Sequence, residues 1–281
     1  MTDAAGAYLG EAAAGPANLT LGIDVAVAAI VEASQRAFAA AGVAREAMER
    51  TYAGIGLAGA SVLTDTDTVR ARLPFRAVAI ESDAVTACLG AHGGRDGGIL
   101  IVGTGSHGLA FLKGKPIRFG GWGFAISDDA SGAILGRAAV RAAVAAFDGL
   151  APASAVTDAL MAEFGGDPAA TVRWALDARP SDYAAFVPLV LRHADQGDPV
   201  ATALLADAVH AAAQLVDRLL ALGVTRVALM GGLAETYRAR LPVRLASTIV
   251  DACGDALDGA IMLARQQFSL RAPYRPAADP P

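Results

Sequence analysis

The sequence predicts an α/β fold, on the basis of its length, its two kinds of apolar pattern and the position of its glycines. The 281 residues suit two domains or one large domain. Short apolar runs typical of strands alternate with longer segments of helical periodicity in both halves of the chain. Glycine turns follow several of the strands, at the edge where α/β proteins commonly bind ligands.

Composition and charge exclude several classes of protein. The chain is 54% hydrophobic with a mean hydropathy of +0.42, but alanine supplies much of this content. No window offers the roughly 18 uninterrupted apolar residues of a spanning helix, and no charged start precedes an apolar core as in a secretory signal. We therefore expect a cytoplasmic protein that binds no membrane. A net charge of −5 and only two lysines, Lys113 and Lys115, argue against a nucleic-acid partner.

The cysteines and histidines predict no metal site. Cys88 and Cys253 lie far apart without the spacing of metal ligands, and we expect both to be buried small side chains in a reducing compartment. The histidines are scattered and are expected to face solvent or to serve structure: His92, His107, His193 and His210.

The first half of the chain is expected to pair helices with short strands. Residues 24–41 carry apolar side chains at helical spacing, among them Val27, Val31 and Phe38, and stop at Gly42. The full expectation is the end of a β-hairpin at 1–12, a helix at 24–41, a strand at 51–58, a helix at 61–72, a strand at 77–80 and a helix at 83–91.

The second half is expected to open with three short strands and to continue with helices. The strands at 99–102, 108–112 and 117–119 are separated by tight glycine turns, which predicts an antiparallel meander. The remaining expected elements are helices at 129–147, 154–164, 169–176, 186–194 and 199–222, a strand at 225–230 and a helix at 258–267. The last residues, 272–281, contain four prolines and are expected to be disordered.

A series of glycine turns and single acidic residues predicts phosphoryl transfer to a small hydroxylated substrate. Phosphates need backbone N–H donors brought close to them, and glycine permits that approach. The accepting hydroxyl needs an acid–base residue beside it. The segments are Ser82-Asp83, Gly103-Thr104-Gly105-Ser106, Gly120-Gly121-Trp122-Gly123, Ser127-Asp128-Asp129 and Gly231-Gly232.

Taken together and in this order, these segments resemble the BadF/BadG/BcrA/BcrD-type ATPase family, and within it the bacterial N-acetylglucosamine and glucosamine kinases. Each motif alone is weak, whereas four in order are fairly specific, and the resemblance runs from residue 1 to about 268. The matching segments are Ser82-Asp83-Ala84, Gly103–Ser106, Gly120–Gly123, Asp128 with Ser131–Arg137, and Gly15–Leu19 before a helix.

The resemblance implies the actin/sugar-kinase/Hsp70 ATPase fold, in which two ribonuclease-H-like domains close on ATP and sugar. The implied domains are residues 1–93 and 94–271, the second with a helical insertion, followed by the tail 272–281. Gly93–Gly98 is the expected crossover and one hinge. Family members are often dimers, so a homodimer is an expectation as well.

Asp83 is the candidate catalytic residue, because the matching family aspartate accepts the proton of the attacking sugar hydroxyl. Such general-base help is typically worth ~10²–10⁴-fold. The competing interpretation is that Asp83 only caps the following helix, a role that aspartate fills well.

The resemblance assigns ATP to two glycine turns. Gly103, Thr104, Gly105 and Ser106 form the second phosphate loop, and Gly231-Gly232 forms the adenosine loop. The alternatives are an ordinary glycine hairpin and a strand-ending turn, since a lone G-x-G is weak support. Mg²⁺ is the implied metal, but no residue of this chain is assigned to hold it.

Asn18, Gly121, Trp122 and Asp128 are the implied sugar contacts. A tryptophan offers an apolar face and an N–H donor, and a carboxylate accepts directional hydrogen bonds from sugar hydroxyls. The alternatives are a turn residue for Asn18, core packing for Trp122 and a helix cap for Asp128. The family often has Asp-Glu-Gly-Ser where this chain has Asp128-Asp129-Ala130-Ser131, a change that could alter sugar preference.

One departure concerns the start of the sequence. Family members open with a strand and an Asp-Gly-Gly-Gly-Thr turn, which is the first phosphate loop, whereas Met1-Thr2-Asp3 resembles the second strand of that hairpin. The N-terminal domain is therefore expected to lack its first strand and to show an unpaired sheet edge. A misassigned start codon and a truncated, weakened or silent member both explain this departure.

We therefore predict an ATP-dependent kinase for glucosamine or N-acetylglucosamine, acting at the 6-hydroxyl. The alternative is a sugar-binding or regulatory protein without phosphotransfer, because the first phosphate loop is missing. A reductase-activating ATPase of the same broad family is disfavoured, since neither cysteine lies in a glycine turn that could hold an iron–sulfur cluster.

Overall fold

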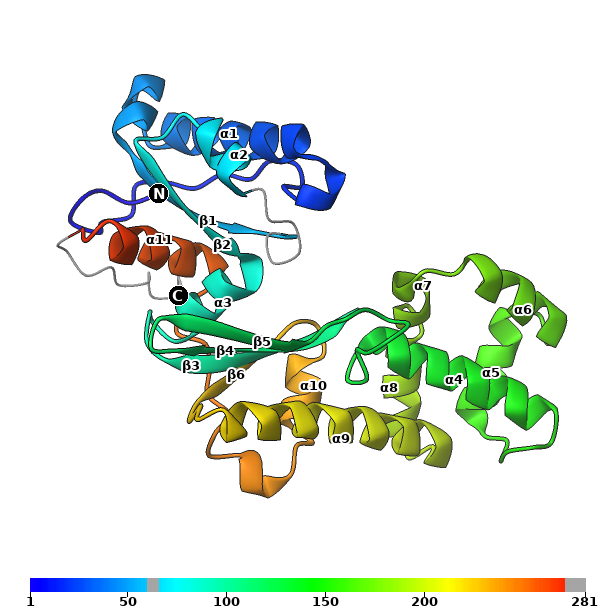
Figure 1. The fold of residues 1–281 in the computed structure, drawn as a ribbon. Helices are drawn as coiled ribbons and strands as arrows, with labels where there is room; N and C mark the ends of the chain where they lie inside the picture. The colour runs from blue at the N-terminus through cyan, green and yellow to red at the C-terminus, as the bar shows by residue number, and fades with distance from the viewer. Residues whose placement is uncertain (60–65, 271–281) are drawn as a thin grey trace. The chain divides into compact units, whose positions relative to one another are not determined.

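The computed structural model describes residues 1–59 and 66–270 and contains two compact units (Figure 1). The first unit comprises residues 1–97, 111–116 and those from 251 onward, and the second comprises residues 98–110 and 117–250. Each unit combines helices with a sheet, which confirms the predicted α/β class. The division differs from the expected ranges 1–93 and 94–271, because residues after 250 pack in the first unit. The expected tail 272–281 lies outside the described residues.

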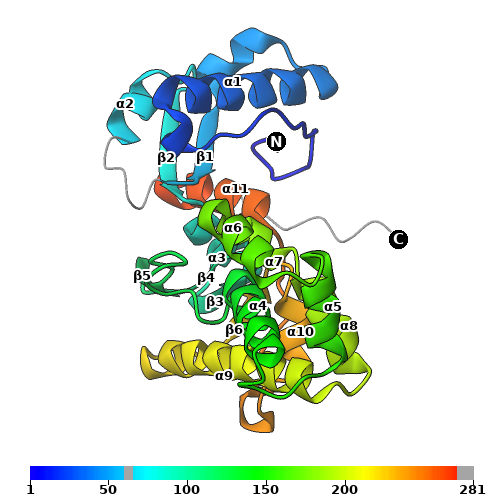
Figure 2. The same cartoon turned by 90° about the vertical axis from the view of Figure 1, so that its right-hand side faces the viewer.

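The first unit is a layered structure in which two parallel strands lie between helices. Both views show α1 on one side of strands β1 and β2, and α11 on the other (Figures 1 and 2). Its elements are η1 (Leu19–Leu21), α1 (Ile23–Ala40), η2 (Arg45–Arg50), β1 (Tyr52–Leu57), α2 (Thr66–Ala71), β2 (Ala77–Ser82), α3 (Asp83–Ala91) and α11 (Ala256–Gln267). The predicted helix 61–72 is thus seen only from Thr66, because residues 60–65 lie outside the described residues.

Strands β1 and β2 pair in register from Tyr52 opposite Ala77 to Leu57 opposite Ser82. Their apolar side chains, with those of α1 and α2, form one core that includes Val27, Leu57 and Val78. Within the described residues the sheet of this unit has only these two strands, and a single bridge links Thr2 to Tyr8 where the end of a hairpin was predicted. Among the described residues no other strand pairs with β1, and a parallel bridge between Asn18 and Ala58 lies just beyond its end.

Helices α3 and α11 cross so closely that their backbones touch. A Cβ atom on Gly90 of α3 would lie 1.7 Å from the carbonyl oxygen of Asp255, and one on Gly259 of α11 would lie 1.8 Å from that of Thr86. No side chain can occupy such space, so both positions require glycine. This crossing fixes α11, which comes from the end of the chain, on the helix that follows β2.

The second unit is built on a sheet of strand order β5-β4-β3-β6, in which β3 and β6 are parallel. The three predicted meander strands are neighbours, as expected. The elements are β3 (Gly97–Val102), β4 (Ser106–Leu112), β5 (Lys115–Gly120), α4 (Gly132–Phe147), α5 (Ala155–Glu163), α6 (Pro168–Asp177), α7 (Pro180–Ala184), α8 (Val187–Asp195), α9 (Pro199–Ala221), β6 (Val227–Met230), α10 (Ala234–Arg238) and η3 (Val243–Leu245).

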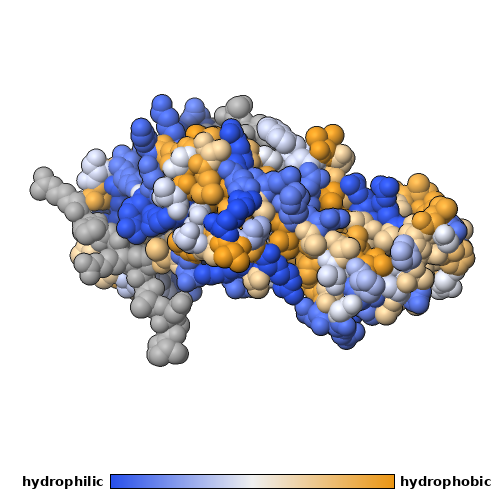
Figure 3. Space-filling view, turned by 90° about the horizontal axis from the view of Figure 1, so that it is seen from below, coloured by the Kyte–Doolittle hydropathy of each residue, from blue (hydrophilic) through white to orange (hydrophobic). Residues whose placement is uncertain are grey.

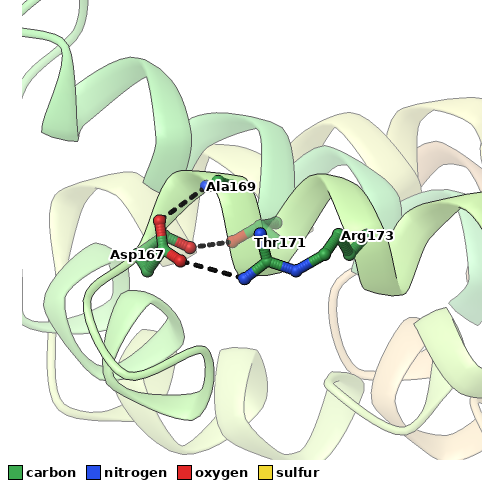
Figure 4. A network of polar contacts seen from close by, with 4 residues as sticks. All are labelled: Asp167, Ala169, Thr171 and Arg173. Atoms are coloured by element: carbon green, nitrogen blue, oxygen red, sulfur yellow. Dashed lines mark hydrogen bonds and ion pairs between the residues drawn. The ribbon is translucent and has the colours of Figure 1, made fainter.

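Helices α4 to α8 lie between β5 and β6 along the chain, and local capping residues set where several of them begin. Asp167 caps α6: its carboxylate accepts the Ala169 N–H at 2.9 Å and the Arg173 guanidinium at 3.1 Å, and these bonds lower the pKa of Asp167 (Figure 4). Helix α4 starts at Gly132 rather than at Asp129, because Ser131 is its cap and accepts the N–H of Ile134.

Helix α9 is the one described helix long and apolar enough to cross a membrane by length and composition. It meets this criterion although its apolar run is interrupted, since Asp207, Asp217 and Arg218 lie within it. Its apolar face packs against α4 and α8, with Leu205 and Val216 buried. Hydrophilic residues also interrupt the hydrophobic ones across the surface seen from below (Figure 3). One face of α9 therefore packs within the second unit, and a single such helix is weak support for a membrane span.

The two cysteines differ, which corrects one expectation. Cys88 is fully buried in α3, as predicted, whereas Cys253 is exposed. The prediction was wrong for Cys253 because it lies before α11 begins, where only its backbone N–H is fixed, by a bond to the carbonyl oxygen of Ala91. Among the described residues, no group of three His, Cys, Asp or Glu side chains could hold a metal ion.

We predict that Gly259→Ala will destabilise the first unit. The added methyl group gains the better helix propensity of alanine, roughly 0.5–1 kcal/mol, but must displace the backbone of α3. Overpacking of this kind typically costs about 1–3 kcal/mol, and contact with backbone rather than a mobile side chain places this case at the upper end. Urea unfolding should show a lower midpoint. Gly15→Ala is the matched control, since a Cβ there meets nothing within 4 Å. Equal urea midpoints for the two variants would contradict the close backbone contact between α3 and α11.

A thiol assay should separate the two cysteines. Burial raises the pKa of Cys88 to about 12, so its reactive thiolate is scarce at pH 8, whereas Cys253 is accessible. The folded protein should react with Ellman's reagent at one thiol, and Cys253→Ser should abolish that fast reaction. Both thiols should react in urea. Two fast thiols in the folded wild type would show that α3 opens or packs differently.

Candidate active site

The carboxyl ends of β3 and β6 bring two of the predicted glycine turns together. Ile101 of β3 lies opposite Met230 of β6, so the turns that follow the two strands leave the same edge of the sheet. The N–H of Leu233 donates to the carbonyl oxygen of Val102 at 3.1 Å. Gly231, at φ 96°, packs onto the same carbonyl, where a Cβ would be only 2.4 Å away. Gly231-Gly232 is therefore adjacent to the start of Gly103–Ser106.

The turn Gly103–Ser106 is held in place by its carbonyl groups. Gly103 accepts the N–H of Gly132 at 2.7 Å, and Thr104 accepts that of Ala133 at 3.3 Å. In the described part of the chain, the N–H groups of Thr104 and Gly105 donate to no other protein group. Thr104 is also exposed. This arrangement leaves two backbone donors free at a rigid, glycine-lined turn, which is what an anionic phosphate requires.

Asp128 lies against this turn and is buried. It is 9% exposed, has a left-handed backbone at φ 71°, and one carboxylate oxygen, Oδ1, has no hydrogen-bond partner in the described structure. The other oxygen, Oδ2, would be 3.1 Å from a Cβ placed on Gly105. A buried carboxylate without a partner is costly and typical of a ligand-binding position.

The side chain of Asp128 does not cap helix α4, as the alternative interpretation would require. Ser131 caps α4, and Asp128 contributes to the turn before it through its backbone: its carbonyl oxygen accepts the Ser131 N–H at 2.8 Å. Its own N–H donates to Ser127 Oγ at 2.6 Å. The Asp128 carboxylate thus remains available to a ligand.

The segment Gly120–Gly123 presents Trp122 to solvent. Gly120 and Gly121 have φ near 67° and 66°, and the indole is 71% exposed, so Trp122 is not a core residue. Two hydrogen bonds anchor the backbone of the segment: Arg118 donates to the Gly121 carbonyl at 3.0 Å, and the backbone N–H of Trp122 donates to Ser127 Oγ at 3.4 Å.

Phe124, two residues after Trp122, contacts side chains of helices α4 and α7. The guanidinium of Arg137 lies 4.6 Å from the centre of the Phe124 ring, and Tyr183 packs on that ring at 5.3 Å. The free indole face therefore sits on a loop with fixed ends.

Asp83 and Asn18 lie in the first unit. Ser82 is the cap of α3, and its Oγ accepts the Val85 N–H at 3.3 Å. Asp83 is exposed at the first position of the helix, where Oδ1 accepts the adjacent Ala84 N–H at 2.9 Å. Ser82 therefore performs most of the capping of α3, and the Asp83 carboxylate faces solvent.

Asn18 performs the role of a turn residue. It precedes the short helix η1, and its Oδ1 accepts both the backbone N–H and the hydroxyl of Thr20, each at 2.9 Å. The Asn18 side-chain oxygen is thus used locally. Contact between its amide NH₂ and a sugar remains a prediction.

Two residues that support the site were not predicted as part of it. Arg137 contacts the Phe124 ring, and Tyr237 donates to the Ala130 carbonyl oxygen. Ser127, which accepts the Asp128 N–H, lies in a segment that the sequence already indicated. Arg137 was visible only as the last residue of a family motif, and Tyr237 had no sequence signal, because its partner lies 107 positions away.

Similar proteins are sugar kinases. Over 263 residues the chain is 36% identical to the glucosamine kinase GspK of Vibrio cholerae, covering 92% of this chain and 88% of that protein. It is 30% identical over 144 residues to the N-acetyl-D-glucosamine kinase of Dictyostelium discoideum, covering 49% of this chain and 45% of that one.

Solved structures agree with the fold. A crystal structure described as an N-acetylglucosamine kinase of Chromobacterium violaceum matches with a TM-score of 0.80 and 34% identity, over 92% of this chain and 91% of that one. A ROK hexokinase of Thermus thermophilus matches with a TM-score of 0.52 and 21% identity, over 88% and 87%, which supports the fold alone. The chain has the actin-like sugar-kinase fold.

The sequence profile of one family covers nearly the whole described chain. It matches residues 1–264 and so includes every site residue discussed above. The chain belongs to the BadF/BadG/BcrA/BcrD ATPase family.

Proposed function

We propose that this protein is an ATP-dependent kinase that phosphorylates an amino sugar, glucosamine or N-acetylglucosamine, at its 6-hydroxyl. The observation that carries the proposal is the buried Asp128 carboxylate, with a free oxygen, beside a turn whose Thr104 and Gly105 N–H groups are also free. The Asp128 carboxylate, for a sugar hydroxyl, then lies beside the Thr104 and Gly105 N–H groups, for phosphate, at the turn that follows β3. Family membership and 36% identity to a glucosamine kinase support the same activity.

The two glycine turns of the second unit are proposed to bind ATP. The Thr104 and Gly105 N–H groups and the Thr104 hydroxyl would donate to phosphate oxygens. Gly231-Gly232 leaves the same sheet edge and would contact the adenosine portion. Because α4 fixes the carbonyl groups of the loop, the loop loses little conformational entropy when nucleotide binds.

The sugar is proposed to bind at Asp128, Trp122 and Gly121. The Asp128 Oδ1 atom would accept a hydrogen bond from a sugar hydroxyl, which would satisfy a buried oxygen that now has no partner in the described structure. The exposed indole of Trp122 would cover an apolar face of the pyranose ring. Asn18 is proposed as a further contact through its amide NH₂.

Asp83 is proposed as the general base. Its carboxylate is exposed, and Ser82 performs the capping of α3, so Asp83 is free to accept the proton of the attacking 6-hydroxyl. Its hydrogen bond with the Ala84 N–H fixes one oxygen and leaves the other for substrate.

Mg²⁺ is proposed as the metal, and the residues present fit its usual manner of binding. In kinases this ion is commonly held by one or two carboxylates, waters and the substrate phosphates, so a dedicated protein cage is not required. Because Asp128 is proposed to bind the sugar, no residue of this chain is assigned to the ion, which would be held mainly by waters and the phosphates of ATP. When bound, the ion would neutralise charge on the phosphates. A homodimer and a cytoplasmic location are part of the proposal.

We predict that Asp83→Asn will abolish sugar-dependent ADP release. Loss of the base should lower kcat by ~10²–10⁴-fold and leave sugar affinity nearly unchanged, because asparagine keeps the shape and cannot accept a proton. The assay uses ATP, Mg²⁺ and a panel of glucosamine, N-acetylglucosamine and glucose. Asp207→Asn, on the exposed side of α9, is the charge-matched control.

The same assay tests the alternative of a sugar-binding protein without phosphotransfer. Sugar binding measured by calorimetry without ADP release would favour that alternative. A version extended upstream in frame should then recover activity if the kinase proposal holds. An Asp83→Asn variant as active as wild type would remove Asp83 from the mechanism.

We predict that Asp128→Asn will raise the KM for sugar by roughly 10–150-fold, as expected for a hydrogen bond to a charged group worth about 1.5–3 kcal/mol. Asparagine tolerates a left-handed backbone, so the turn should persist. The KM for ATP should change little. Asp129→Asn is the matched control, because Asp129 is adjacent but exposed. Equal effects of the two variants would show that charge in general, rather than the Asp128 carboxylate, matters.

A further inference from the structure

Tyr237 of α10 connects to the Asp128 turn by one buried hydrogen bond. Its side chain is fully buried, and its hydroxyl donates to the carbonyl oxygen of Ala130 at 3.0 Å. Ala130 is itself 0% exposed and lies at the centre of the turn from Asp128 to Ser131. We infer that Tyr237 is a positioning residue that holds the Asp128 carboxylate in its sugar-binding orientation; this inference rests on the proposed function.

The Asp128 turn needs such support because its backbone is strained. A non-glycine residue at φ 71° is uncommon, and positions of this kind persist only where their surroundings fix them. Two bonds fix the ends of the turn: the Ser131 N–H donates to Asp128, and the Gly132 N–H donates to Gly103. The hydroxyl of Tyr237 fixes its middle.

Tyr237 can perform this role because α10 is anchored to the sheet. The Tyr237 N–H donates to the Leu233 carbonyl at 3.0 Å, and the Leu233 N–H donates to Val102 at the end of β3. Val102 is fully buried in the sheet. The phenol therefore extends from a rigid base that also positions Gly231-Gly232, and one short chain of contacts joins the proposed adenosine turn to the proposed sugar ligand.

The hydroxyl keeps its proton under the conditions of the reaction. Burial raises the pKa of Tyr237 above its ordinary value, so the group remains a donor throughout the neutral range. Its role is thus to hold the turn and not to exchange protons. A purely structural hydroxyl would affect stability alone, whereas a positioning hydroxyl would also change sugar affinity.

Tyr237→Phe removes the hydroxyl and keeps the ring. We expect the KM for sugar to rise about tenfold, with the KM for ATP unchanged and kcat altered much less. Calorimetric titration with sugar should show the same loss of affinity. In combination with Asp128→Asn, the Tyr237→Phe change should add little further loss, because the carboxylate that it positions is already gone.

Thr157→Val is the matched control. It removes another buried hydroxyl of the second unit, one that donates to the Ser154 carbonyl at 2.8 Å, and should lower stability without raising the KM for sugar. A wild-type sugar KM in Tyr237→Phe would overturn the inference, as would full multiplicative loss in the double variant. KM does not depend on the fraction of enzyme that is folded, so marginal folding of the variant does not change it. For the calorimetric titration, trimethylamine N-oxide is added to stabilise the folded state.

Failure of the proposed function would look different. Wild-type protein without sugar-dependent ADP release contradicts the kinase proposal, and the Tyr237 inference is then decided by the calorimetric sugar titration, which needs no turnover. Wild-type protein that neither turns over nor binds any sugar of the panel overturns both. Active wild type together with unchanged Tyr237→Phe overturns the positioning role alone.

Discussion

Backbone packed directly on backbone is the constraint on which both units depend. In the first unit, Gly90 and Gly259 let α3 and α11 cross at a distance that excludes even a methyl group. In the second, Gly231 brings the turn after β6 onto the carbonyl of Val102. Close packing of this kind leaves no adjustable side chain between elements, so each contact has one geometry. The precision of the candidate site follows from these contacts more than from its polar residues.

The candidate site illustrates how such rigidity serves chemistry. Asp128 is buried, strained and incompletely hydrogen-bonded, a combination that would relax if its surroundings could move. The backbone bonds of Gly103, Gly132 and Ser131 and the hydroxyl of Tyr237 prevent that relaxation. A ligand hydroxyl then gains a partner that was oriented before binding, so less of its binding free energy is spent on ordering the protein.

Most of the fold and part of the site could be predicted from the sequence. Long periodic helices such as α1 and α9, and the strands that end in glycine turns, carry local signals, and so they were located within a few residues. Helices α7 and α10 were missed because five residues are too few to show a period. The exposure of Cys253 and the return of α11 to the first unit depend on contacts between distant segments, for which a single sequence has no pattern.

For the site, residue types and turns were predictable, but their support was not. The glycine turn after the buried strand at 99–102 was predicted as a phosphate loop and Trp122 as a sugar contact, but the sequence left open whether the indole is exposed or packed in the core. The burial of Asp128 against Gly105 could not be predicted, since it results from the left-handed turn at Asp128 and from Tyr237, far along the chain.

The discontinuity of the first unit has a consequence for biosynthesis. Its core helix α11 lies near the end of the chain, whereas α3, on which it packs, precedes the whole second unit. A ribosome therefore releases the second unit before the first can close, and the intervening residues must fold as an insertion within an unfinished neighbour. Until α11 emerges, the apolar surface of α3 lacks its cover, and nascent chains stalled before residue 256 should be the form most dependent on chaperones.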